Sequence, residues 1–303
     1  MDIYLPIAGQ SVNALFIVVL GFLVGLLSGM FGVGGGFLTT PLLIFYGIPP
    51  TVAVASAATQ ITGASVSGAI AHMRRGGVDL KMGGVMIAGG VFGSVVGAAM
   101  FRLLQSTGQI DVVIGFLYVL ILGWIGVLMF LDSLKSLGYI QVPEPDGARP
   151  RHNRWVASLP YRWRFHGSGI YISPVAPFAL GFLAGTLTVF LGIGGGFILV
   201  PAMIYLLGMP ARVVIGTSLL MILAVTAATT MVHAITTRAV DIVLAALLLV
   251  GGVIGAQYGA LLTLRVKPDF LRLALAVIIL LVALRMALGL AWRPEEIFSI
   301  EYL

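Results

Sequence analysis

The sequence contains no cysteine and few charged residues. Charged side chains make up 9% of its 303 residues, whereas soluble domains carry about 25%. The absence of cysteine excludes disulfides, thiol catalysis and thiolate metal sites. Because 59% of the residues are hydrophobic, most of the surface is predicted to face lipid. The net charge of +6 is therefore interpreted as a membrane-topology signal, and no nucleic-acid partner is expected.

Carboxylates are missing from the centres of the apolar segments. Cation carriers and proton pumps commonly use carboxylates buried in the membrane, so this absence favours an anionic or neutral solute. The chain has four histidines, and the spans offer no nucleophile–base pair or metal cluster. We therefore expect no enzymatic activity, no cofactor and no metal site.

Ten apolar runs predict an all-α polytopic membrane protein. They show no alternation with a period of two, so strands are not expected in them. Two runs are too short to cross a bilayer core of about 30 Å, because a twelve-residue helix reaches only about 18 Å. The runs cover residues 12–31, 36–47, 51–72, 82–102, 110–131, 175–192, 196–208, 213–236, 243–263 and 271–292.

A polar segment separates two membrane halves. Residues 133–170 are rich in proline and arginine, with tryptophan and tyrosine among the arginines. Such a segment is typical of a cytoplasmic loop on anionic lipid headgroups. The predicted organisation is an N-terminal membrane repeat at 1–132, a basic linker at 133–170 and a C-terminal membrane repeat at 171–303.

The two halves are an internal duplication. GFLVGLLSGMFGVGGGF begins at Gly21 and GFLAGTLTVFLGIGGGF begins at Gly181, a spacing of 160. A one-residue insertion in the second half raises the spacing to 161, as at Ser56 and Thr217. A further insertion, after the pair of histidines, raises it to 162. Repeats of this kind are typical of secondary transporters. The equivalent pairs after the insertions include His72 with His233 and Asp79 with Asp241.

The second half is predicted to be inverted relative to the first. Each half has five hydrophobic elements, an odd number if the short one counts as a crossing. With the central loop and the loop of Arg74, Arg75 and Lys81 placed in the cytoplasm, inversion also leaves fewer basic residues outside than a parallel repeat does. Both chain ends are then expected outside the cytoplasm.

Each half contains a glycine-rich break, GVGGGF from Gly32 and GIGGGF from Gly192. Glycine costs about 1 kcal/mol relative to alanine in a helix interior, and broken backbone in lipid needs new partners. The short helix after each break would begin at membrane depth, where free N–H groups and the positive dipole end favour an anion. The predicted substrate site comprises Gly34, Gly35, Gly36, Phe37, Gly194, Gly195, Gly196 and Phe197.

The alternative role of membrane glycines is close helix packing. It explains three consecutive glycines poorly, because packing needs a small residue at every fourth position. That role is instead predicted for glycines spaced by four residues, namely Gly21, Gly25, Gly29, Gly89, Gly93 and Gly97.

Polar side chains beside the breaks are further candidates. Ser56, Thr59 and Gln60 share a helix face and can donate hydrogen bonds to an oxyanion, and Thr217 and Ser218 occupy the second half. Further hydroxyls follow at Thr226, Thr229 and Thr230. The alternative is that these hydroxyls bond their own helix carbonyls. His72 and His233 either carry a coupling proton or lie as polar side chains at the membrane surface.

The segments GLLSGMFGVGGGFLTTPLL and GIPPTVAVASAATQI, with their second copies, resemble the TauE/SafE family of sulfite exporters and related anion permeases, in the 4-toluene sulfonate uptake permease superfamily. The resemblance implies an inner-membrane carrier of small sulfur-containing or organic anions, such as sulfite or sulfoacetate. Its motif falls on Gly32, Gly34, Gly35, Gly36 and Pro41, and on Gly192, Gly194, Gly195, Gly196 and Pro201.

We therefore expect a secondary transporter that exports its anion by alternating access. Its expected partners are a small anion, the lipid bilayer and a coupling proton. The alternatives are an anion channel of the same architecture and a membrane-embedded enzyme.

Overall fold

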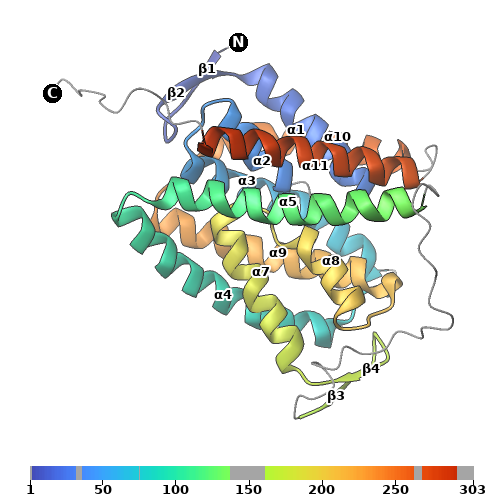
Figure 1. Cartoon of the computed structure of the whole chain (residues 1–303). Coiled ribbons are helices and arrows are strands. Elements are labelled where there is room, and N and C mark those ends of the chain that lie inside the picture. The colour runs from blue at the N-terminus through green and yellow to red at the C-terminus, as the bar shows by residue number, and fades with distance from the viewer. Residues whose placement is uncertain (1, 32–35, 75, 137–160, 263–267, 292–303) are drawn as a thin grey trace. The chain divides into compact units, whose positions relative to one another are not determined.

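The computed structural model describes residues 2–31, 36–74, 76–136, 161–262 and 268–291 (Figure 1). Within these ranges each predicted apolar run coincides with a helix. Five helices, α4, α5, α9, α10 and α11, are long and apolar enough to cross a membrane. The helices are α1 (Ala14–Phe31), α2 (Gly36–Phe45), α3 (Pro50–Arg74), α4 (Leu80–Ser106), α5 (Ile110–Ser136), α7 (Val175–Leu191), α8 (Gly196–Tyr205), α9 (Ala211–Thr236), α10 (Ile242–Leu262) and α11 (Pro268–Ala291).

The sequence patterns did not predict two short antiparallel hairpins, one of which overlaps the first two residues of the apolar run 12–31. One joins β1 (Asp2–Leu5) to β2 (Gln10–Asn13), and the other joins β3 (Trp163–Phe165) to β4 (Ile170–Ile172). They precede α1 and α7, the first helix of each half. Leu5 and Phe165, which correspond at the spacing of 160, are both fully buried.

The described chain forms two compact units. The first contains both hairpins with α1–α4 and α7–α10, and the second contains α5 and α11. Within the second unit the two helices run antiparallel, because Gly115 faces Leu290 and Gly126 faces Ile279. Residues 137–160 of the predicted linker lie outside the described residues, so its boundaries stay a prediction.

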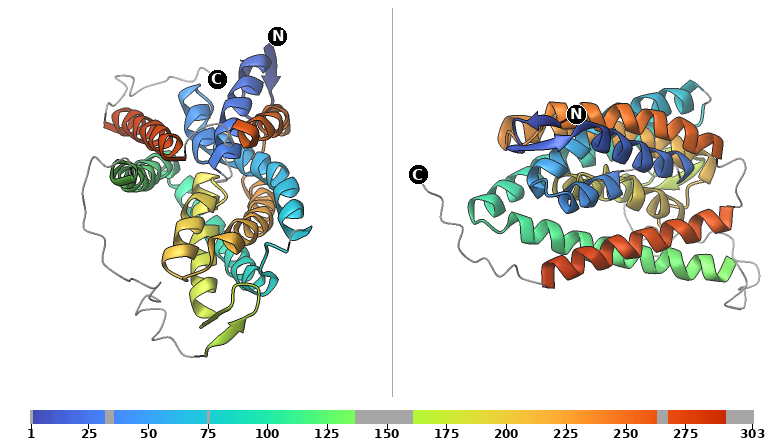
Figure 2. Two further views of the ribbon diagram at one scale, coloured as in Figure 1. Left: turned by 90° about the vertical axis from the view of Figure 1, so that its right-hand side faces the viewer. Right: turned by 90° about the horizontal axis from the view of Figure 1, so that it is seen from above.

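Glycines bring two helix pairs of the first unit into backbone contact. A Cβ atom added at Gly25 of α1 would lie 2.2 Å from the carbonyl oxygen of Gly252 in α10. One at Gly93 of α4 would lie 2.1 Å from that of Phe182 in α7. The same holds along both pairs, so the predicted packing role of these glycines is confirmed. Figure 2 shows α1 lying along α10.

The first unit divides further into two helix bundles. The first bundle consists of α1, α2, α3, α10 and the β1–β2 hairpin, and the second of α7, α8, α9, α4 and the β3–β4 hairpin. They meet chiefly along α3 and α9. These two helices run antiparallel, because Thr59 bonds Thr230, Thr62 bonds Thr226, and Gly68 lies against Leu219.

The short helices α2 and α8 turn back after the breaks. The rings of Phe16 and Tyr46 stack at 4.6 Å, so α2 ends beside the start of α1. The end of α8 shares a hydrophobic cluster with Phe165 and Ile172 of the hairpin that precedes α7. Each short helix has ten residues, or about 15 Å. That length is about half of a 30 Å membrane core.

Candidate functional site

The starts of α2 and α8 meet in the first unit. The rings of Phe37 and Phe197 stack with centroids 4.7 Å apart, and both side chains are buried. Gly36 faces the carbonyl oxygen of Gly192, which a Cβ atom there would approach to 2.9 Å. The Thr40 hydroxyl donates to the carbonyl of Leu191 at 3.1 Å. The structure thus brings the described parts of both predicted breaks together.

The second break is a left-handed turn between α7 and α8. Gly192 ends α7 with a φ of 65°, and its N–H donates to the Thr188 carbonyl at 2.7 Å. Gly194 and Gly195 have φ values of 68° and 71°, which side chains other than glycine rarely adopt. Gly195 caps α8 without a side-chain hydrogen bond. The first-turn N–H groups therefore present the positive end of the helix dipole. Gly34 and Gly35 lie outside the described residues.

In this conformation the second break is tightly packed. A Cβ atom at Gly194 would lie 3.0 Å from Ile222, 3.1 Å from Thr226 and 3.2 Å from Ile61. The break therefore sits between α3 and α9, where the two bundles meet.

Of the predicted donors, Gln60 contacts α2 and Thr59 faces α9. The Thr39 hydroxyl donates to Gln60 Oε1 at 3.1 Å, and Gln60 Nε2 donates to the Leu248 carbonyl at 3.5 Å. Gln60 thus joins α2 to α10. Thr59 donates to its own helix at the Ala55 carbonyl, 3.0 Å away, and lies 3.3 Å from the Thr230 hydroxyl.

The other predicted donors lie elsewhere. The Ser56 oxygen accepts the Asp241 N–H at 3.2 Å, and the Thr217 oxygen accepts the Asp79 N–H at 3.0 Å. Because α3 and α9 are antiparallel, Ser56 and Thr217 are about 20 Å apart along the helix axes. One small anion therefore cannot contact both. Ser218, next to Thr217, donates to a carbonyl of its own helix.

Two buried carboxylates have structural roles that sequence reasoning missed. Asp79 accepts the Met82 N–H at the start of α4, and both the N–H and the hydroxyl of Ser168 at 2.8 Å. Asp241 accepts two N–H groups at the start of α10, and the Ile7 N–H at 3.1 Å. Each carboxylate thus caps a helix and holds the other half's hairpin. Their equivalence in the repeat, directly before a helix, was the available signal.

His233 is buried between the helices of the second bundle. Its Nε2 lies 3.1 Å from the Val189 carbonyl, its Nδ1 lies 3.2 Å from the Thr237 hydroxyl, and its ring meets Phe101 edge to face. A carbonyl only accepts, so Nε2 carries a hydrogen. His72, its equivalent, is only half-buried.

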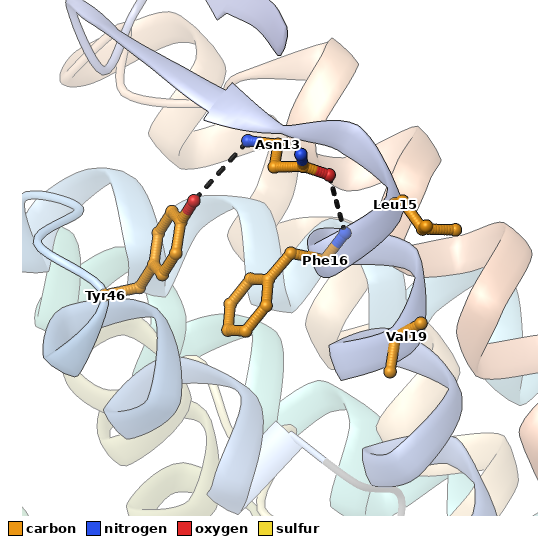
Figure 3. A pocket seen from close by; sticks show the side chains of 5 residues that line it. All are labelled: Asn13, Leu15, Phe16, Val19 and Tyr46. Carbon is orange, nitrogen blue, oxygen red and sulfur yellow. Dashed lines mark hydrogen bonds between the residues drawn. The ribbon is translucent and has the colours of Figure 1, made fainter. Parts of the chain in front are cut away.

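A surface pocket of about 440 Å³ lies where α1 begins and α2 ends (Figure 3). Asn13 donates its N–H to the Tyr46 hydroxyl at 3.4 Å, and the other lining residues are Leu15, Phe16 and Val19. The pocket lies at the opposite end of α2 from the break, so it is separate from the predicted site. In the described part of the chain, no group of three His, Asp or Glu side chains is placed to bind a metal.

Comparison with known proteins gives one family. The model of the family described as sulfite exporter TauE/SafE matches residues 17–286. The probable membrane transporter protein YunE of Bacillus subtilis is 27% identical over 278 residues, which cover 88% of this chain and 94% of that protein. YjnA of the same organism, also described as a probable membrane transporter protein, is 29% identical over 275 residues, which cover 89% of this chain and 98% of that protein. Arabidopsis thaliana sulfite exporter TauE/SafE family protein 6 is 27% identical over 135 residues, which cover 41% of this chain and 31% of that protein. No solved structure shows significant similarity.

Proposed function

The chain belongs to the sulfite exporter TauE/SafE family, a family of multi-pass membrane transporters and not of enzymes, and on that premise we propose that it is a secondary transporter that exports small sulfur-containing or organic anions. The substrate class is sulfite and sulfonates such as sulfoacetate. The observation that carries this proposal is the meeting of the α2 and α8 starts at Phe37 and Phe197. Neither short helix contains a charged residue, so backbone N–H groups and helix dipoles provide the attraction for an anion.

The helix directions support an inverted repeat. Equivalent helices α3 and α9 run antiparallel, as expected if a two-fold axis in the membrane plane relates the halves. The other pairs are reciprocal, because α1 packs on α10 while α7 packs on α4. The hairpins follow the same reciprocal pattern, since each donates a hydrogen bond to the corresponding aspartate of the other half.

Alternating access then follows from movement of the first bundle against the second. Within each bundle, glycines hold long helices in backbone contact. Between the bundles, the described contacts include side-chain pairs on α3 and α9 and the Phe37–Phe197 stack. Small rotations at this interface would open the breaks first to one face and then to the other.

His233 is suited to carry a coupling proton. With Nε2–H bonded to Val189, Nδ1 is free to gain a proton and donate it to the Thr237 oxygen. The Thr237 hydroxyl retains an acceptor of its own, the His233 carbonyl at 3.0 Å. Protonation therefore requires no loss of partners inside the bundle. His72 remains the second candidate.

Flux measurements in proteoliposomes test the proposal. We expect saturable sulfite flux that sulfoacetate inhibits and that responds to a pH gradient. Gly195→Leu should abolish this flux, because the left-handed backbone and Ala184 leave no room for the side chain. His233→Gln should carry sulfite without responding to the pH gradient. If folded wild-type protein carries neither sulfite nor sulfoacetate, the proposed substrate class is wrong.

A further inference from the structure

Four threonine hydroxyls form a polar line between the two bundles, here called the hydroxyl seam. Thr62 and Thr226 have their hydroxyl oxygens 2.9 Å apart. One turn further along, those of Thr59 and Thr230 are 3.3 Å apart. Thr226 is fully buried and the other three are half-buried.

The inner end of the seam touches the second glycine break. The methyl group of Thr226 would lie 3.1 Å from a Cβ atom at Gly194, and Ile61, the neighbour of Thr62, packs against both breaks. The outer end points toward the start of α3 and the end of α9. That end of the unit carries Asp241 and the β1–β2 hairpin that it binds.

Three of the four seam hydroxyls have no counterpart on the other side of the breaks. At the spacing of 161, Thr59 and Thr62 correspond to Leu220 and Leu223, and Thr230 corresponds to Ala69. Only Thr226 has a hydroxyl-bearing equivalent, the buried Ser65. On that side Leu219 packs against Gly68, and Leu220 packs against Gly83. The contact between α3 and α9 is therefore richer in hydroxyls on one side of the breaks and richer in leucine on the other.

We propose that the hydroxyl seam is the route by which the anion travels between the breaks and the face that carries the β1–β2 hairpin, an inference that rests on the proposed function. An anion that leaves water needs hydrogen-bond donors in place of its hydration shell. Thr59, Thr62 and Thr226 now donate to carbonyls four residues earlier in their helices. A threonine in a helix has two accessible χ1 rotamers, so each hydroxyl can exchange that carbonyl for the anion. On the leucine side three of the four equivalent positions lack a hydroxyl, so that side closes as a largely apolar gate.

Isosteric substitutions separate a binding role from a packing role. Thr62→Val and Thr226→Val keep the side-chain shape and remove the hydroxyl, whereas Thr62→Ser and Thr226→Ser keep the hydroxyl and remove the methyl group. In the sulfite flux assay, each valine variant should raise the half-saturating concentration about tenfold, which is 1.4 kcal/mol. Each serine variant should stay within about twofold of wild type.

The control is Thr236→Val, since Thr236 on the same helix donates to the Val232 carbonyl and lies outside the seam. Its flux should match that of wild type. Valine variants with wild-type saturation, or serine variants as impaired as the valine variants, would overturn the proposal. Absence of flux in wild type would overturn the proposed function. Normal flux in wild type and in the valine variants would overturn the seam proposal alone.

A second measurement does not depend on the valine variants folding. Because the chain has no cysteine, Thr59→Cys introduces a single thiol at the outer part of the seam. A thiol reagent that carries a sulfonate should label this thiol in proteoliposomes, and sulfoacetate should slow the labelling. A thiol that the reagent does not reach, or labelling that sulfoacetate leaves unchanged, contradicts the proposed route.

Discussion

At the scale of single residues, the carboxylates of Asp79 and Asp241 determine how the two halves are joined. Each caps a helix and also accepts a hydrogen bond from a distant hairpin. The bond from Ser168 spans 89 residues of sequence and the bond from Ile7 spans 234. A buried carboxylate is stable only where such donors replace water. These aspartates therefore hold the structure together and need not take part in transport.

Substitution of Asp79 should destabilise the protein. Asp79→Ala removes the cap of α4 and leaves the Ser168 N–H and hydroxyl without their acceptor. Loss of the cap alone costs about 1 kcal/mol, and the lost hairpin bonds add to it. We expect a lower melting temperature in detergent, with Ser168→Ala showing a smaller decrease. Asp132→Ala is the control, because Asp132 is exposed. Equal melting temperatures for all three variants would argue against this role.

Residue roles could be predicted where the pattern lies within one helix, and could not where they depend on how two helices pack. The glycine spacing indicated close packing at Gly25 and Gly93 because that pattern lies within one helix. The polar character of Ser56 and Thr217 was equally visible, but their separation was not. It depends on the antiparallel packing of α3 and α9, which brings Thr59 next to Thr230 instead.

At the scale of elements, the helix pairs α1–α10 and α4–α7 depend on glycine. Where a Cβ atom would lie about 2 Å from a facing carbonyl oxygen, even alanine forces the helices apart. In the same helices, glycines that face open space serve no such purpose. The helix α4 contains both kinds, since Gly93 faces Phe182 and Gly84 has nothing within 4 Å of its added Cβ atom.

Two alanine substitutions in α4 therefore should have opposite effects. Gly93→Ala should lower the free energy of unfolding by about 1–3 kcal/mol, because overpacking at a tight contact shifts the backbone. Gly84→Ala should leave stability unchanged or raise it by up to about 1 kcal/mol, because alanine favours helix. Chemical or thermal unfolding in detergent measures both. A Gly93→Ala variant as stable as wild type would show that the contact between α4 and α7 is looser than described.

Helix positions could be predicted from hydrophobic runs, and the short lengths of α2 and α8 indicated that neither crosses alone. The hairpins were missed because their strands have only three or four residues, too few to show an alternating pattern. Their position becomes clear only with Asp79 and Asp241, whose partners lie in the other half.

At the scale of the whole molecule, the structural groups of the first unit differ from the halves of the sequence. The N-terminal half contributes α1, α2 and α3 to one bundle but α4 to the other, and the C-terminal half exchanges α10 in return. Hydropathy and repeat spacing cannot reveal this exchange, because it depends on which helices pack together. If the bundles are the moving bodies, a loop from α3 to α4 and another from α9 to α10 connect them.

The central claim, that transport requires movement of one bundle against the other, is tested most directly by two disulfide cross-links in the naturally cysteine-free chain. Thr59 and Thr230 belong to different bundles, whereas Ser94 and Thr229 belong to the same one, and each pair has hydroxyl oxygens 3.3 Å apart. The two side chains of each pair are in contact, so cysteine sulfur atoms at the same positions would lie within reach of each other. Sulfite flux is measured in proteoliposomes before and after oxidation, and again after reduction.

Oxidation of the Thr59→Cys, Thr230→Cys protein should abolish flux, and reduction should restore it. Oxidation of the Ser94→Cys, Thr229→Cys protein should leave flux unchanged. Continued flux through the fully cross-linked Thr59→Cys, Thr230→Cys protein would contradict the account, because it would show that the anion passes without movement between the bundles, as in a channel.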